Sequence, residues 1–211
     1  MPTPILTALL IVANVLGAGM IVPQVARTHR RGEIAGVSIA WLGVGVALNA
    51  WWVGYALAGH LYGILPVSIG ALVLYGILAV LHHRIVGRGT VAGLARGAVA
   101  VSLAPGVALA LAGWTAAGLM IGLSYAVQFS PAMITAVRSA DLSGISPTTW
   151  SMAFGEAAIW LVYGLAIADA ALVIGGGGGA AMSAVILVRL AGRSGRLDLL
   201  RPAPQVAQRL D

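Results

Sequence analysis

The stretch that decides the fold runs from residue 34 to residue 83 and reads IAGVSIAWLGVGVALNAWWVGYALAGHLYGILPVSIGALVLYGILAVLHH. It holds no Asp, Glu, Lys or Arg. A helix of about 20 apolar residues crosses the hydrocarbon core of a bilayer, so this stretch has room for two transmembrane helices. Residues 1–26 and 97–137 lack the same four residue types. The pattern predicts a polytopic membrane protein built from α-helices.

The composition of the whole chain excludes a water-soluble globular domain. Of its 211 residues, 60% are apolar and 9% are charged, and the mean hydropathy is +0.97. A soluble domain has about a quarter of its residues charged. All twelve basic residues are Arg and lie in short clusters between apolar segments, which favours loop charges over a nucleic-acid interface.

The sequence lacks the motifs that carry enzyme chemistry. There is no Cys, so disulfides and thiolate metal sites are excluded. Metal-ligand spacings, catalytic triads and phosphate-binding loops do not occur, so we expect neither an enzyme nor a bound cofactor. The first charged residue, Arg27, follows the first apolar run instead of preceding it, so we expect that run to stay as a mature helix.

Apolar runs and the breakers between them predict seven spans. Their expected bounds are 4–26, 36–58, 61–81, 97–113, 115–137, 147–168 and 170–190. All twelve arginines then fall on one side, which the positive-inside rule assigns to the cytoplasm. We expect a multi-pass protein of the cell (plasma) membrane with its N-terminus outside and its C-terminus in the cytoplasm.

An internal repeat emerges when the chain is aligned with itself at an offset of 108 residues. The matched pairs include Pro23 with Pro131, Arg30 with Arg138, Gly36 with Gly144, Ser38 with Ser146, Trp52 with Trp160 and Tyr55 with Tyr163, and Glu33 and Asp141 match in charge. We predict three-helix repeats at 1–83 and 114–192, joined by a loop and linker helix at 84–113 and followed by a polar cytoplasmic tail at 193–211. One linker helix makes the two repeats parallel, a 3+1+3 arrangement.

Two ordered sets of motifs carry a resemblance to a known family. The first repeat reads VPQVARTHRRGEIAGVS at 22–38 and WWVGY at 51–55, and the second reads YAVQFSPAMITAVRSADLSGISP at 125–147 and WLVYGLAIAD at 160–169. With Pro, a basic loop, Gly-x-Ser and Trp-x-x-Tyr in this order twice, the chain resembles the SWEET and PQ-loop family of small transporters over residues 1–190. The resemblance implies seven helices and the movement of a small solute by alternating access.

The resemblance also implies a central binding site. In that family a tryptophan from each half stacks on the sugar, which matches Trp52 and Trp160 here, and an asparagine from each half binds its hydroxyls. The asparagine positions fall near Ser68 and Gly176, so the usual polar pair is absent, and a site without such partners selects a sugar weakly. From the residues alone, the other interpretation of both tryptophans is an aromatic belt at the membrane interface.

Prolines near the cytoplasmic ends of the spans act as hinges in that family. Pro23, Pro131 and Pro147 match three of its four hinge positions, and Ile39 occupies the fourth. A proline inside a helix frees one carbonyl, which Gln24 is placed to bind beside Pro23. The other interpretation is that each proline simply ends a helix.

At the outer end, Asp169 matches an acidic position near the family's gate, and we group Tyr55 and Tyr163 with it. His60 and Tyr62 lie at the outer end of the other half, where they are placed to meet Asp169, although an exposed loop carboxylate is equally compatible with the sequence.

A run of five glycines at 175–179 lies in the last span. It either widens the pathway or lets this span pack closely against a neighbour. Because glycine weakens helices by about 1 kcal/mol per residue relative to Ala, we expect local irregularity there.

Glu156 is the one acidic residue well inside an expected span. It lies four residues before Trp160 and seven before Tyr163, so the three share one helix face, and the cost of exposing an ionisable group to lipid turns that face toward the central path. Its repeat counterpart is Leu48. We expect Glu156 to bind a proton, a substrate amine or a sugar hydroxyl, unless it forms a structural hydrogen bond to Asn49 or a backbone carbonyl. Asn49 itself either lines the path or bridges helices.

These observations predict a SWEET-like transporter of a sugar or similar small solute. Two alternatives stay open: a proton-coupled PQ-loop carrier of an amine or amino acid that uses Glu156, and a receptor-like or structural membrane protein without transport. The expected partners are the solute and the lipid bilayer, without nucleic acid. The sequence leaves open the identity of the solute, its direction, proton coupling and any homo-oligomer.

Overall fold

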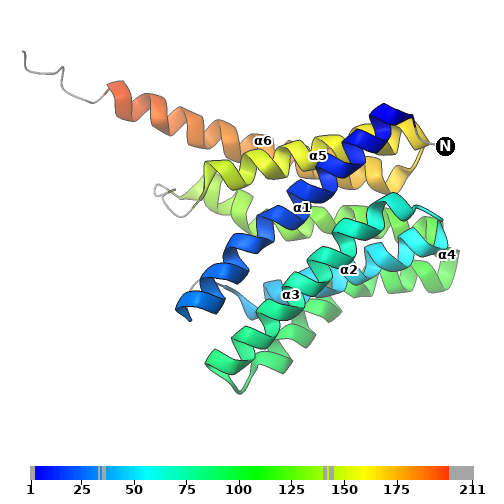
Figure 1. The fold of residues 1–211 in the computed structure, drawn as a ribbon, viewed down its shortest axis with the longest axis horizontal. Helices are drawn as coiled ribbons and strands as arrows, with labels where there is room; N and C mark the ends of the chain where they lie inside the picture. Colours follow the sequence, from blue (N-terminus) through cyan, green and yellow to red (C-terminus); the bar gives the residue numbers. More distant parts are fainter. Residues whose placement is uncertain (1–2, 33, 35–36, 140–141, 143–144, 200–211) are drawn as a thin grey trace, which may run out of the picture.

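The computed structural model describes residues 3–32, 34, 37–139, 142 and 145–199, and the side chains of this set as far as residue 192. These residues form six α-helices, one short 3₁₀ helix and no strand (Figure 1). The elements in chain order are α1 (Pro4–Arg31), α2 (Ile39–Ala58), η1 (Tyr62–Ile64), α3 (Leu65–Val86), α4 (Thr90–Arg138), α5 (Pro147–Ile167) and α6 (Ala170–Leu199). The repeat positions Glu33, Gly36, Asp141 and Gly144 lie outside the described residues.

The outer surface of this bundle is apolar. Large apolar side chains are exposed along it, among them Val15 on α1, Val73 on α3 and Leu111 on α4, which is 82% exposed. Each of the six helices is long and apolar enough to cross a membrane. The prediction of an all-helical, multi-pass membrane protein is confirmed at this level.

The structure has six helices where the sequence predicts seven, because the expected spans 97–113 and 115–137 lie in one element, α4. Gly113 breaks α4 with φ 76° and ψ −169°, a conformation that suits glycine. A straight helix of 49 residues would be about 75 Å long, far more than a bilayer core. Instead, Gly97 contacts Ala40 of α2 while Gln128 donates to Tyr75 Oη of α3, whose ring packs on Trp41 of α2. The two parts of α4 therefore flank the same end of α2, and the chain folds back at Gly113.

Neighbouring helices of the bundle pack closely against one another, and glycines allow the shortest distances between them. α1 packs against α3 and α5, α2 against α3 and α4, and α6 against α4 and α5. Glycines allow the closest approaches: a Cβ at Gly97 would overlap the Ala40 carbonyl, and one at Gly122 would meet the Ala171 carbonyl of α6. Small residues serve the same purpose in membrane helices generally, since they let backbones approach.

α2 and α5 begin in the same way, 108 residues apart. Ser38 caps α2 by accepting a hydrogen bond from the Trp41 amide at 3.3 Å, and Ser146 caps α5 by accepting one from the Thr149 amide at 3.3 Å. A serine at this position satisfies a helix amide that has no partner within the helix. Two matched serines of the sequence repeat therefore have the same structural role.

Several expected boundaries differ from the structure. α1 continues past 26 to Arg31 and ends at Gly32, which has φ 66°. α6 continues past 190 to Leu199, so 193–199 extend this helix and only 200–211 of the expected tail lie outside the described residues. The glycine run at 175–179 is helical throughout, contrary to the expected irregularity. An unpaired backbone group is costly in a bilayer, which outweighs the weak helix propensity of glycine.

Candidate functional site: a cavity between the two halves

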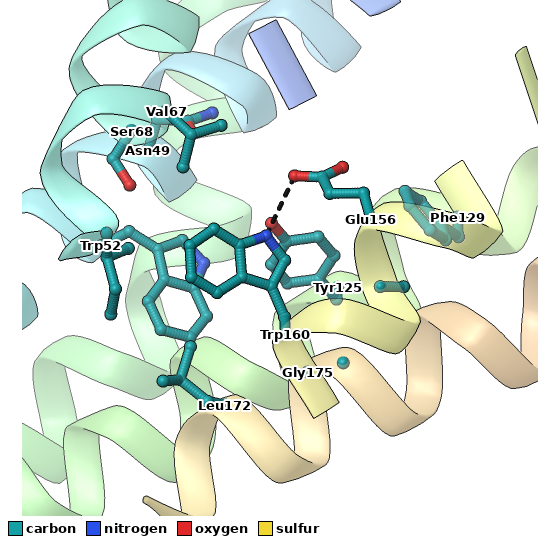
Figure 2. A pocket seen from close by; sticks show the side chains of 13 residues that line it. Asn49, Trp52, Val67, Ser68, Tyr125, Phe129, Glu156, Trp160, Leu172 and Gly175 are labelled. Carbon is teal, nitrogen blue, oxygen red and sulfur yellow. Dashed lines mark hydrogen bonds between the residues drawn. The ribbon is translucent and has the colours of Figure 1, made fainter. Parts of the chain in front are cut away.

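Trp52 of α2 and Trp160 of α5 meet at the centre of the bundle. Their side chains are only 4% and 6% exposed and approach from opposite sides (Figure 2). Each packs edge-to-face on the tyrosine three residues later: the Trp52–Tyr55 ring centroids are 5.8 Å apart at 81°, and the Trp160–Tyr163 centroids are 6.1 Å apart at 77°. This burial inside the bundle argues against an aromatic belt at the membrane surface.

Both tryptophans line a small chamber of about 30 Å³. Ten of its thirteen lining residues form five pairs separated by 108 in sequence. These pairs are Asn49 with Ala157, Trp52 with Trp160, Ile64 with Leu172, Val67 with Gly175, and Ser68 with Gly176. Matched positions of the two repeats thus face each other across the chamber.

A wider cavity of about 620 Å³ adjoins this chamber. The two share five lining residues, namely Asn49, Val67, Tyr125, Phe129 and Glu156. The wider cavity extends to the ends of the helices at Gln24 of α1, Ser38 of α2, Pro131 of α4 and Thr149 of α5, and we call this the open end. The chamber is therefore the innermost part of one space that opens at one end of the bundle.

Glu156 lies at the junction of the chamber and the wider cavity and is 7% exposed. Its Oε1 accepts a hydrogen bond from Trp160 Nε1 at 3.1 Å (Figure 2). It packs against Gly17 of α1, where a Cβ would overlap both Oε1 and a methyl group of Val67. The alternative of a bond to Asn49 is not seen among the described contacts, where Asn49 Nδ2 donates to the Gly45 carbonyl of its own helix at 2.8 Å.

The two tryptophans differ in what their indole nitrogens contact. Trp160 donates to Glu156, but the residue equivalent to Glu156 in the first half is Leu48, which offers no acceptor. Trp52 Nε1 is buried and has no hydrogen-bond partner among the described residues. Leaving a buried hydrogen-bond donor without an acceptor costs free energy, so an acceptor placed at this nitrogen would be stabilising.

The positions equivalent to the family's asparagines have different surroundings. Ser68 is 2% exposed and lines the chamber. Gly176 lines it too, but a Cβ there would overlap the backbone amide of Leu161 and lie 2.8 Å from the Ala157 carbonyl. Close packing of α6 on α5 therefore leaves no room for any side chain at Gly176.

The opposite end of the bundle, which we call the closed end, is held by a hydrogen bond between the halves. Tyr55 Oη of α2 donates to Asp169 Oδ2 at 2.7 Å. Asp169 Oδ1 accepts from the Leu172 amide at 2.9 Å, so the start of α6 fixes the carboxylate. The expected partners are wrong: His60 Nδ1 bonds instead to Tyr62 Oη at 2.9 Å, and Tyr62 is 59% exposed.

The apolar core is also distributed unequally between the two ends. Its larger cluster, which includes Trp52, Ile64, Ile121, Trp160 and Leu172, joins residues of both halves beside the closed end. The second cluster consists of Leu42, Ala71, Tyr75 and Leu78, all from α2 and α3. The halves are thus packed together at one end and separated by the wide cavity at the other.

The candidate hinge residues have distinct surroundings. Pro23 and Pro131 lie inside α1 and α4. Pro131 frees the Val127 carbonyl, and Ser130 Oγ donates to it at 3.0 Å. Gln24 donates to Thr28 Oγ1 at 3.1 Å, so the described contacts do not show the expected bond to a freed carbonyl.

Pro147 lies at the start of α5, where a proline suits the first helical turn. It therefore begins its helix instead of bending it.

Sequence reasoning missed four cavity residues that the repeat itself could have indicated. Gly17 and Tyr125 are 108 residues apart, and both line the wide cavity. Phe129 is likewise the counterpart of Ile21, and both also line it. Extending the self-alignment from the matched pairs to every position on the same helix face would have identified all four.

A scan against protein-family models finds no match for this chain, and searches of curated proteins and of solved structures find none either.

Proposed function

We propose that the protein is a seven-span transporter of a small solute, similar to the SWEET and PQ-loop transporters, that works by alternating access. In this proposal α4 supplies two spans, a linker helix before Gly113 and the first helix of the second repeat after it. The halves then form a parallel 3+1+3 pair. The backbone break at Gly113, the matched caps Ser38 and Ser146, and the matched Trp–Tyr pairs all support this arrangement.

One observation carries the functional proposal: equivalent residues of both halves line a cavity that reaches one end of the bundle, while a hydrogen bond and the larger apolar cluster join the halves at the other end. A solute site between two similar halves is accessible to either side in turn if the halves rock about it. The Tyr55–Asp169 bond closes one end, while Pro23 and Pro131 lie in helices that line the open end. The present arrangement corresponds to one of the two states that such a cycle requires.

We further propose that the open end faces the cytoplasm of a cell with this protein in its plasma membrane. Arg31 at the end of α1, Arg84 near the end of α3 and Arg138 at the end of α4 lie at that end, consistent with the positive-inside rule. A fluorescent reporter that folds only in the cytoplasm should glow when fused after Asp211. It should stay dark when inserted beside His60, and the reverse pattern would contradict this orientation.

Uptake by purified protein in liposomes tests transport directly. We would add radiolabelled sugars, amino acids and amines outside liposomes that contain the native chain, and compare their uptake with that of liposomes without protein. Saturable uptake of at least one solute supports the proposal. No uptake of any solute by protein that is folded and inserted would favour the alternative of a receptor-like or structural membrane protein.

Glu156 favours a second candidate, a proton-coupled carrier of an amine or amino acid. The carboxyl group lies at the junction of chamber and cavity, where a proton and a solute would both contact it. Coupling predicts that Glu156→Gln loses pH-dependent uptake but still exchanges solute between the two sides. Uptake with unchanged pH dependence in Glu156→Gln would remove this residue from the mechanism.

A further inference from the structure

Equivalent positions of the two halves line the chamber, but the side chains at these positions differ in polarity. On the side of the first half it presents Asn49, Ser68 and the indole of Trp52. The equivalent residues of the second half are Ala157, Gly176 and Trp160, of which the first two have no polar side chain. The second half contributes Glu156 instead, where the first half has Leu48. Neutral hydrogen-bonding groups thus lie on one side and a carboxyl group on the other.

Glu156 has no cationic neighbour in this space. Among the described residues that line the chamber and the wide cavity there is no Arg, Lys or His. Gly17 of α1 packs against it and Trp160 of α5 donates to it, while Val67 of α3 and Tyr125 of α4 line the same chamber. A buried carboxyl group is neutral when protonated, and its ionised form needs a positive charge or several donors to balance it. A cation that arrives with the solute would supply that charge at this site.

Aromatic rings surround the same point. Trp52, Trp160, Tyr125 and Phe129 line the chamber, and the Trp52–Tyr125 and Tyr125–Phe129 ring centroids are 6.0 and 5.8 Å apart. The electron-rich faces of such rings attract organic cations. Inorganic cations retain their water and do not need such a lining, whereas an ammonium group on an apolar body fits it.

Trp52 Nε1 adds a second requirement. It is a buried donor that no acceptor satisfies among the described residues, in a tryptophan that lines the chamber. A solute oxygen would supply the acceptor. Since the chamber holds only about 30 Å³, the group that enters it must be small, and the body of the solute must occupy the wider cavity.

We propose that the cavity binds a small organic ammonium ion that carries a hydroxyl or carbonyl oxygen, with the ammonium group at Glu156 and the oxygen at Trp52 Nε1. The inference rests on the proposal that this cavity is a solute site, and it names the class of solute. Because the two halves provide different groups, the solute binds in one orientation, with its cationic end toward the second half.

Three probes that differ by one group each test this proposal by calorimetry on detergent-solubilised native protein. They are 2-amino-1-phenylethanol, 1-phenyl-1,2-ethanediol, which lacks the ammonium group, and 2-phenylethylamine, which lacks the hydroxyl. We expect the amino alcohol to bind at least tenfold more tightly than the diol, because the diol leaves Glu156 without a cation. We expect it to bind about fivefold more tightly than the amine, the usual value of one net hydrogen bond. Equal binding of the amino alcohol and the diol would overturn the proposal.

Variants assign the two contacts. Glu156→Gln should remove the preference for the amino alcohol over the diol, and Glu156→Asp should keep part of it. Trp52→Phe should remove the preference for the amino alcohol over the amine. Trp51→Phe is the matched control, because Trp51 Nε1 donates to Ser102 Oγ of α4 at 2.9 Å and lies outside both cavities. A preference that survives Glu156→Gln in folded protein would contradict the assigned contact.

The proposed binding site and the proposed transport function can be refuted independently of each other. Ammonium selectivity in detergent without uptake into liposomes would refute transport and leave the binding site intact. Uptake of a neutral solute that Glu156→Gln leaves unchanged would support transport and refute the ammonium site. If the Glu156 variants fail to fold, the comparison of the three probes on the native chain still decides the question.

Discussion

The hydrogen bond between Tyr55 and Asp169 should hold the closed end, and Tyr55→Phe removes it while keeping the ring. The two atoms are 2.7 Å apart, and the acceptor is a carboxylate fixed by the Leu172 amide. Hydrogen bonds to charged groups contribute about 1.5–3 kcal/mol. Tyr55 is only half-buried, so water screens the bond and the lower value of about 1.5 kcal/mol applies.

A loss of about 1.5 kcal/mol raises the population of the opened state about tenfold relative to the closed one. The chain has no native Cys, so a single thiol reports on this opening. Ile64→Cys places the thiol in η1, where the native side chain is 3% exposed and lines the chamber. A membrane-impermeant thiol reagent added to sealed vesicles only on the side of the closed end should therefore label Ile64→Cys about ten times faster in the Tyr55→Phe background than with Tyr55 present.

Tyr163→Phe is the control for this measurement. Tyr163 is the repeat counterpart of Tyr55 and packs on Trp160 in the same way, but its hydroxyl makes no hydrogen bond in the described part of the chain. Labelling in this background should change by less than about twofold, because Tyr163→Phe keeps the ring and removes no hydrogen bond between the halves. Equal labelling rates with Tyr55→Phe and with Tyr55 would refute the role of the hydrogen bond in closing this end.

Two glycine positions give further predictions. Gly17→Ala should weaken solute binding and lower the melting temperature, because the new methyl would overlap Glu156 Oε1. Gly19→Ala, whose methyl would lie 3.5 Å from the flexible Met152 side chain, should change neither by a comparable amount, and equal effects would contradict the close contact. Gly113→Ala should destabilise the fold by about 1–3 kcal/mol, because its φ of 76° and ψ of −169° define a backbone conformation that essentially only glycine adopts, as followed by thermal unfolding in detergent. The control Gly106→Ala should not destabilise, and a Gly113→Ala variant as stable as the native chain would indicate that the break in α4 is not needed.

The repeat in the sequence predicted much of the candidate site, because equivalent positions on equivalent helices meet at the contact between two halves. Trp52 and Trp160 could be paired in this way, and the cost of placing a carboxyl group in lipid directed Glu156 inward. Gly17 was not foreseen, because a glycine has no side chain to suggest a role and its importance comes from a contact on another helix.

Other features depend on how the halves sit against each other, which composition and periodicity do not specify. Asp169 meets Tyr55 instead of His60, since the angle between the halves decides which side chain of α2 reaches the start of α6. Likewise, the sequence predicts that 97–137 holds two spans. It does not predict that a single residue, Gly113, makes the turn between them without an intervening loop.

Alternating opening of the two ends is tested most directly by the distance between spin labels at Gln24→Cys and Ala132→Cys. These residues are repeat counterparts on α1 and α4 and line the wide cavity near its open end. Pulsed electron resonance should give a long and a short distance, and Tyr55→Phe should increase the short population, because the open end closes as the opposite end is released. A single distance that Tyr55→Phe leaves unchanged would contradict alternating access in this protein.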